Sequence, residues 1–193
     1  MKKSTIAIIA AAAVLVVWGI ASYNGFVSKE ETVTKAWSNV ETQYQRRADL
    51  IPNLVNTVKG YAAHEENTFK EVVAARAQAT SIQIDPSNIT PEQLQAYQQA
   101  QSQVGSALGR LIAVAENYPE LKASQNFQEL QAQLEGTENR IQKSRTEYND
   151  AVQKYNVSVR RFPGNIIAGI FGFDKRISFQ AAEGSEKAPE VVF

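Results

Sequence analysis

IAIIAAAAVLVVWGIA, residues 6–21, is apolar throughout and lies inside a longer stretch, residues 4–28, that carries no formal charge. An α-helix rises about 1.5 Å per residue, so roughly 20 residues cross a hydrocarbon core about 30 Å thick. The segment from Thr5 to Asn24 is long enough to do so. The sequence therefore predicts a membrane-spanning helix near the N-terminus.

The residues expected to face lipid or its boundary are Thr5, Ile6, Ile9, Val14, Val17, Trp18, Ala21 and Asn24. Aromatic side chains such as Trp18 and Tyr23 suit the lipid–water interface. A cleaved secretory signal peptide is the alternative, because Gly19 and Ala21 form a small-x-small pattern. We favour a retained anchor, since no helix breaker precedes the expected cut after Ala21.

The lysines on the two sides of this segment bear on its direction. Lys2 and Lys3 favour a cytoplasmic N-terminus, although Lys29 and Lys35 follow closely on the other side. We expect the rest of the chain to lie outside the cytoplasm. The sequence has no cysteine, which excludes disulfides, thiol catalysis and a lipid-bearing cysteine.

The remaining chain, about 165 residues, is long enough for one domain with a sizeable core. Twenty Lys and Arg residues balance twenty Asp and Glu residues, without a long run of like charge. This balance argues against a general nucleic-acid surface. Abundant Ala and Gln favour helix.

Two interleaved seven-residue series place one apolar stripe on a long helix after the anchor. They are Val33, Val40, Arg47, Leu54 and Tyr61, and Trp37, Tyr44, Ile51 and Val58. Pro52 lies inside the stripe, so we expect a kink or a break near Leu50 to Pro52, and we favour a kink because the stripe keeps its phase across the proline. Asn24-Gly25 is either a hinge or tolerated within the helix. Helical spacing continues through Phe69, Val72, Val73 and Arg76 and ends near Ser81.

Polar segments divide the rest of the chain. Residues 81–90 form a predicted loop, after which Thr90 and Gln93 have the identities of a capping box. Asn117-Tyr-Pro119 interrupts that helix, and Ser124 is the expected cap of the next one. In this last long helix large residues recur every seven positions: Phe127, Leu134, Ile141, Tyr148, Tyr155 and Phe162.

These loops fold the chain back on itself, so we predict an all-α fold with an N-terminal transmembrane helix and an antiparallel bundle of long helices. A long two-stranded coiled coil is the alternative. The expected boundaries are 1–28 for the anchor, 29–163 for the bundle and 164–193 for an apolar segment and a tail, packed on the bundle or mobile. FPGNIIAGIFGF, residues 162–173, packs on the bundle end or lies at a membrane surface, and we favour packing.

The stretch QRRADLIPNLV, residues 45–55, places a charge on the apolar stripe. Arg47 falls in the core-facing series, where an unpaired guanidinium is strongly unfavourable. We expect a carboxylate partner from another helix: Glu116, Glu138 or Glu147. An internal salt bridge that fixes helix register is favoured over a polar groove for a partner. The candidate structural or interaction residues are Arg46, Arg47, Asp49, Pro52, Asn53, Phe162 and Pro163.

Motifs for catalysis or cofactor binding are missing from the sequence. The single histidine, His64, has no second histidine, and no Glu-x-x-His motif exists to bind a metal. Gly164, Gly169 and Gly172 lack the spacing of a phosphate loop, and no serine lies in a nucleophile elbow. We therefore predict no catalytic, cofactor-binding or metal-binding residues, and a protein that is not an enzyme.

Three separated motifs carry a family resemblance over nearly the whole chain: YNGFV at 23–27, AWSNVETQYQRRADLIPNLVNTVKGYAAHE at 36–65 and YNDAVQKYNVSVRRFPGNIIAGIFGF at 148–173. In these motifs and their order the chain resembles the LemA family. The resemblance implies a helical bundle anchored in the bacterial inner membrane, with no established catalytic activity. The family-like positions are Trp37, Val40, Arg46, Arg47, Asp49, Leu50, Pro52, Asn53, Leu54, Val58, Gly60, Tyr61, Glu65, Tyr148, Asn149, Tyr155, Asn156, Phe162, Pro163, Gly172 and Phe173.

Three functions are compatible with these features. The favoured hypothesis is a single-pass, non-enzymatic scaffold or interaction protein of the bacterial envelope, with an unidentified protein partner and possible homo-oligomers. The second is a self-assembling protein that remodels membranes and contacts lipid through residues 162–173. The third is a hydrolase with a site that the sequence does not reveal.

Overall fold

The computed structural model describes residues 3–180, and every regular element among them is helical. The long helices are α1 (Lys3–Lys59), α2 (Glu66–Ser81), α3 (Pro91–Val114) and α5 (Gln125–Arg160). The short ones are the 3₁₀ turn η1 (Ala115–Asn117), α4 (Pro119–Ala123) and α6 (Gly164–Phe171). The predicted all-α fold is confirmed. The predicted mobile or packed tail beyond Gln180 lies outside the described residues.

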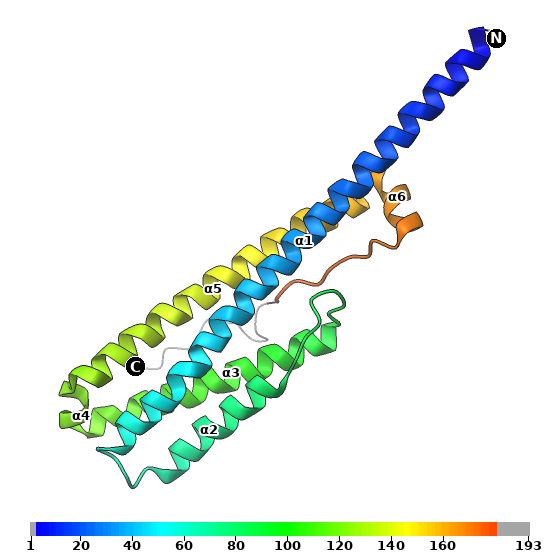
Figure 1. Ribbon diagram of the computed structural model, residues 1–193. Coiled ribbons are helices and arrows are strands. Elements are labelled where there is room, and N and C mark those ends of the chain that lie inside the picture. Colours follow the sequence, from blue (N-terminus) through cyan, green and yellow to red (C-terminus); the bar gives the residue numbers. More distant parts are fainter. Residues whose placement is uncertain (1–2, 181–193) are drawn as a thin grey trace, which may run out of the picture.

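Helix α1 runs the length of the molecule (Figure 1). Its N-terminal part projects alone, whereas the rest packs antiparallel to α5. The α2–α3 hairpin packs beside the far end of α1, and α6 lies where α1 leaves the bundle. At 1.5 Å per residue, the 57 residues of α1 measure about 85 Å. Because the helix is unbroken at Asn24-Gly25, the apolar segment continues into the bundle as one helix.

Pro52 does not end α1. The helix continues to Lys59, so of the kink or break expected near Leu50 to Pro52 the less favoured alternative, the break, does not occur. A proline in a helix interior leaves the carbonyl four residues earlier without its amide donor. The side chain that compensates for this loss belongs to α2 and is described with the site.

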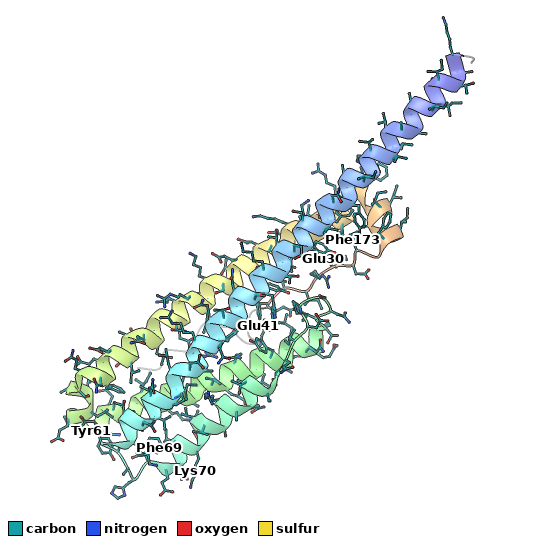
Figure 2. The ribbon with its side chains drawn as sticks, in the orientation of Figure 1. Glu30, Glu41, Tyr61, Phe69, Lys70 and Phe173 are labelled. Atoms are coloured by element: carbon teal, nitrogen blue, oxygen red, sulfur yellow. The ribbon has the colours of Figure 1, made fainter. Side chains whose placement is uncertain are left out.

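A turn at residues 60–65 separates α1 from α2, although the sequence predicted helical spacing across it. The Ala62 N–H donates to the Val58 carbonyl at 2.9 Å and closes the end of α1. Tyr61, which the periodicity assigned to the apolar stripe, is 45% exposed at the tip of the bundle (Figure 2). The seven-residue spacing of apolar residues has the same phase before and after Gly60, so periodicity alone did not show that the chain reverses direction there.

The start of α3 has the predicted capping box. Thr90 Oγ1 accepts from the Gln93 N–H at 3.2 Å, while Gln93 Oε1 accepts from the Thr90 N–H at 3.0 Å. Ser124 occupies the N-cap of α5, but its side chain makes no capping hydrogen bond. Local sequence therefore defines the α3 boundary more strongly than the α5 boundary.

The core consists of two apolar clusters arranged along the bundle. One includes Trp37, Val40, Tyr97, Tyr148, Tyr155 and Phe179, and the other includes Ile51, Leu54, Val72, Leu108, Leu111 and Phe127. The seven-residue series of α5 is buried from Phe127 to Tyr155, as predicted. Phe162 departs from the series and is 77% exposed, because α5 ends at Arg160.

Candidate functional site

Buried polar side chains lie near the boundary between the two clusters. Within residues 3–180 they are Arg47, Gln101, Thr137 and Ser144. Arg47 Nη2 donates to the Gln101 backbone carbonyl at 2.9 Å and to Gln101 Oε1 at 2.5 Å, and Nη1 donates to Glu138 Oε1 at 2.9 Å. Arg47, only 4% exposed, therefore joins α1 to α3 and α5.

The partner of Arg47 is one of the three carboxylates considered from the sequence. Glu138 keeps 45% of its side chain exposed, whereas the side chain of Arg47 keeps 5%. The guanidinium carbon also lies 5.1 Å from the centre of the Tyr44 ring, within the range of a cation–π contact. Removing Glu138 would be costly, because the guanidinium of Arg47 would stay buried without its anionic partner. The arrangement thus fixes the register of α1 against its neighbours.

A small polar cavity of about 130 Å³ adjoins this arginine and is lined by Glu41, Arg47, Arg76, Tyr97 and Gln101, among others. It has room for a few water molecules. Burial raises the pKa values of the Glu41 carboxyl and the Tyr97 hydroxyl. The described part of the chain contains no cluster of three His, Cys, Asp or Glu side chains that could hold a metal ion.

The other predicted residues of this stretch point away from the core. Arg46, Asp49, Pro52 and Asn53 are exposed. Gln45 Nε2 donates to Asp49 Oδ1 at 2.7 Å along the outer face of α1. Arg47 alone among the five candidates in this stretch is buried.

Arg76 of α2 compensates for Pro52. Because Pro52 has no N–H, the Ala48 carbonyl loses its helical donor. Arg76 Nε donates to that carbonyl oxygen at 2.8 Å. A side chain from the neighbouring helix therefore replaces the missing bond, and α1 continues through the proline.

Replacing Arg76 with alanine is expected to lower the free energy of unfolding by about 1–3 kcal/mol, because a partly buried carbonyl loses a charged donor. In a Pro52→Ala background the loss is expected to shrink, since alanine at this position restores the N–H donor to the Ala48 carbonyl. Denaturant unfolding of the four proteins of this double-mutant cycle measures the coupling.

The matched control for this cycle is Arg110→Ala, whose exposed ion pair with Glu71 lies between α2 and α3. It should show no coupling to Pro52→Ala. Additive losses for Arg76→Ala and Pro52→Ala would mean that the hydrogen bond to Ala48 does not compensate for the proline.

A C-terminal strap, residues 173–180, runs back along α5 without regular secondary structure. Asn156 Nδ2 donates to the Arg176 carbonyl at 2.8 Å, and Asn156 Oδ1 accepts from the Arg176 N–H at 2.9 Å. Seven residues earlier on α5, Asn149 makes the same two contacts with Phe179, at 3.1 and 2.9 Å. Two amide side chains thus hydrogen-bond the N–H and carbonyl groups of Arg176 and Phe179, as the backbone of a neighbouring strand would.

Aromatic contacts hold the strap on the bundle. The Phe179 ring stacks on Trp37 with centroids 5.7 Å apart, and the Arg145 guanidinium carbon lies 4.7 Å from the centre of the Phe179 ring. The Tyr148 hydroxyl donates to the Ile177 carbonyl at 2.9 Å. Burial raises the pKa of Tyr148 to about 12, so this donor keeps its proton at neutral pH.

The N-terminal part of α1, which projects from the bundle, is apolar and exposed. The described residues include one helix, α1, that is long and apolar enough to cross a membrane, and none of its apolar window is buried. The predicted lipid-facing residues Ile6, Ile9, Val14 and Val17 are each more than half exposed. Phe162 and Pro163 are exposed beside this segment, where α5 gives way to α6.

Comparison with known proteins places these features in a family. A model of the LemA family matches residues 36–193. The chain belongs to the LemA family. Two magnetosome proteins of Paramagnetospirillum magneticum strain AMB-1, MamQ 1 and MamQ 2, are each 31% identical over 175 residues, with 82% of this chain and 64% of the relative covered. Protein LemA of Metamycoplasma hominis strain PG21 is 24% identical over 160 residues, covering 83% and 69%. The chain thus spans less than two thirds of MamQ.

The residues that carried the LemA resemblance occupy contacts between elements more often than open surface. Trp37 and Tyr155 are fully buried, and Asn149 and Asn156 hold the strap. The sequence indicated the asparagines only as family-like positions. Their seven-residue spacing on α5, in phase with Tyr148 and Tyr155, was the signal available for this role.

Replacing Asn149 or Asn156 with alanine is expected to cost about 1–2 kcal/mol each, because strap N–H and carbonyl groups lose their partners. Hydrogen exchange at the Phe179 and Arg176 amides is expected to accelerate in the corresponding variant. Asn53→Ala, at an exposed position of α1, is the matched control. Unchanged exchange at both strap amides would contradict the role assigned to the asparagines.

Proposed function

We propose that this LemA-family chain is a single-pass protein of the bacterial inner membrane whose bundle acts, without catalysing a reaction, as a scaffold for a protein partner outside the cytoplasm. The observation that carries the proposal is the continuity of α1. Its exposed apolar part has the length of a membrane span, and the same helix then supplies the buried face from Val33 to Val58. A partner bound to the bundle is thereby held at the membrane.

The partner is expected on the face formed by α2 and α3. These helices and the strap border a groove of about 1210 Å³, lined largely by Gln, Ser and Ala side chains. Small and amide side chains permit a helix to approach closely and to exchange hydrogen bonds. The names of the relatives, LemA and magnetosome protein MamQ, are not enzyme names, which supports a role in interaction.

Photocrosslinking in membranes tests the scaffold. A photoreactive residue replaces Ser106 in the groove or, as the control, Arg140 on the exposed side of α5. We expect one discrete adduct, identified by mass spectrometry, from position 106 and none from position 140. The same adducts from both positions, or a monomer at both, would refute a specific partner on this face.

Topology and anchoring are measured on the same chain. A reporter fused after Phe193 is expected to be active only outside the cytoplasm, and the chain is expected to stay in the membrane pellet after alkaline carbonate extraction. Release by carbonate would overturn the anchor, whereas reporter activity inside the cytoplasm would reverse the orientation and leave the anchor intact.

A second candidate is a self-assembling protein that remodels membranes. The observation in its favour is the exposed apolar surface of α6 beside the anchor. It differs from a scaffold in requiring contacts between copies, which crosslinking of the purified chain in bilayers would detect as a ladder of multimers.

A further inference from the structure

Helix α6 is apolar on its packed side and on its open side. Its sequence, GNIIAGIF, contains no charged residue. Ala168 is buried against the bundle, and Ile167 packs beside it. On the open side Ile166, Ile170 and Phe171 are 52%, 68% and 58% exposed. A helix of a soluble bundle normally presents polar side chains there, so this side is suited to an apolar environment.

Contacts with α1 fix the position of α6. The Phe171 ring lies 5.0 Å from the Tyr23 ring, and Phe173 packs on Phe26 at 5.4 Å. A Cβ at Gly164 would lie 3.2 Å from Phe26 Cζ, so glycine permits this close approach. Ile167 reaches Gly19 and borders an apolar groove of about 500 Å³ along α1.

These contacts place α6 at the edge of the hydrocarbon core. If Thr5–Asn24 spans the core, Gly19 lies five residues inside its boundary, which is about 7–8 Å at 1.5 Å per residue. Interfacial helices bury their apolar face about 5–10 Å into the boundary between headgroups and acyl chains. The depth that α1 imposes on α6 therefore falls within the range at which an interfacial helix is stable.

Cationic side chains lie close to this boundary. A groove of about 940 Å³ between α1 and α5 is bordered by Lys29, Lys154, Arg161 and Phe162. Lys29 lies five residues beyond Asn24, about 7–8 Å outside the core, which is the height of lipid headgroups. Within residues 3–180, Lys29, Lys154 and Arg161 make no ion pair, while the nearby Glu30 is paired with Arg176.

We propose that α6 and Phe162 insert into the leaflet entered by the bundle-side end of α1, and that Lys29, Lys154 and Arg161 bind the phosphates of anionic phospholipids there. The proposal rests on the membrane anchor of the proposed function. It adds a second attachment beside the anchor, so the bundle cannot rotate freely about α1. The favoured sequence interpretation, packing alone, accounts for the Ile167 side of α6 but not for Ile170.

Spin-label accessibility in the full chain tests the insertion, because the natural sequence has no cysteine. Ile170→Cys reports on α6, Val17→Cys on the anchor, and Val73→Cys on an exposed apolar position of α2. In bilayers we expect the labels at 170 and 17 to be more accessible to oxygen than to a soluble nickel complex. The label at 73 is expected to show the reverse.

The same label tests the cationic groove. We expect the label at 170 to lie deeper in phosphatidylglycerol bilayers than in phosphatidylcholine bilayers. Lys154→Glu with Arg161→Glu should abolish this difference, whereas the matched α5 pair Arg140→Glu with Lys143→Glu should preserve it. An unchanged difference in the first double variant would overturn phosphate binding.

The other outcomes of the spin-label experiment distinguish a failure of α6 insertion from a failure of the membrane anchor. A label at 170 that is as accessible to nickel as the label at 73, while the label at 17 is in lipid, overturns insertion and leaves the anchor standing. Nickel access at 17 overturns the anchor itself. Spin–spin broadening at 170 with low oxygen access shows that a second copy covers α6, and this also overturns insertion.

Discussion

Replacing Arg47 with glutamate is expected to destabilise the bundle by about 3–5 kcal/mol, the range found when a buried charge is left without compensation. The new carboxylate would face three acceptors to which Arg47 now donates hydrogen bonds: Glu138 Oε1, the Gln101 backbone carbonyl and Gln101 Oε1. The acceptors on Gln101 and Glu138 would then be left without their donor, and two carboxylates would repel each other. Denaturant unfolding followed by circular dichroism in detergent micelles measures the loss.

Arg46→Glu is the matched control for this prediction. Arg46 is adjacent in sequence, has the same charge and is exposed, so its replacement should change stability by no more than about 0.5 kcal/mol. Glu138→Gln should fall between the two, because an amide oxygen can still accept from Nη1. Equal losses at positions 46 and 47 would refute the burial of Arg47.

The charge on the apolar stripe shows how far periodicity could predict this fold. The seven-residue series placed Arg47 in the core, and burial then required a carboxylate from another helix. Choosing Glu138 from the three candidates needed the relative axial position of α1 and α5. Periodicity does not give that position, because the apolar phase continues unchanged through the turn at residues 60–65 and so does not show where α1 ends.

Arg76 and the strap were beyond sequence reasoning for a different reason. The periodicity assigned Arg76 to an apolar stripe, but its side chain serves the Ala48 carbonyl that Pro52 leaves free. Proline chemistry predicts a damaged helix, and only the neighbouring α2 shows how the damage is repaired. Likewise, the seven-residue spacing of Asn149 and Asn156 places both on one face of α5, but it does not show that the Asn149 amide pairs with the backbone of Phe179.

The membrane-spanning segment of α1 and the lipid-facing side of α6 differ in how far the sequence could predict them. The length of the apolar segment of α1 follows from composition, and the structure adds that it is continuous with the bundle. The open side of α6 did not follow, because a short helix rich in Gly, Ile and Ala has no polar face from which to infer an orientation. Contacts with Tyr23 and Phe26 supply that orientation.

Trp37→Ala is expected to lower stability by about 3–5 kcal/mol, as for large-to-small changes of buried aromatic residues. Trp37 is fully buried and contacts the rings of Tyr97, Tyr148 and Phe179, at 5.6, 5.3 and 5.7 Å. These rings come from α3, α5 and the strap. One side chain of α1 thus contacts three other parts of the chain, and its removal should also release the strap.

Trp37→Phe should lose less than Trp37→Ala, about 1–3 kcal/mol, because phenylalanine keeps an aromatic ring and leaves only part of the indole volume empty. Within residues 3–180 the Trp37 Nε1 has no partner at normal hydrogen-bond geometry. Burial raises the pKa of the nearby Glu41 carboxyl and the Trp37 Nε1 lowers it in part, so phenylalanine gives up only this weak polar contact. Trp18→Ala, in the segment that projects from the bundle, is the control and should leave unfolding of the bundle unchanged. Hydrogen exchange at the Phe179 amide should accelerate in Trp37→Ala and stay slow in Trp37→Phe and Trp18→Ala. Fast exchange in none of the three would separate strap docking from Trp37 and leave the paired asparagines as its main attachment.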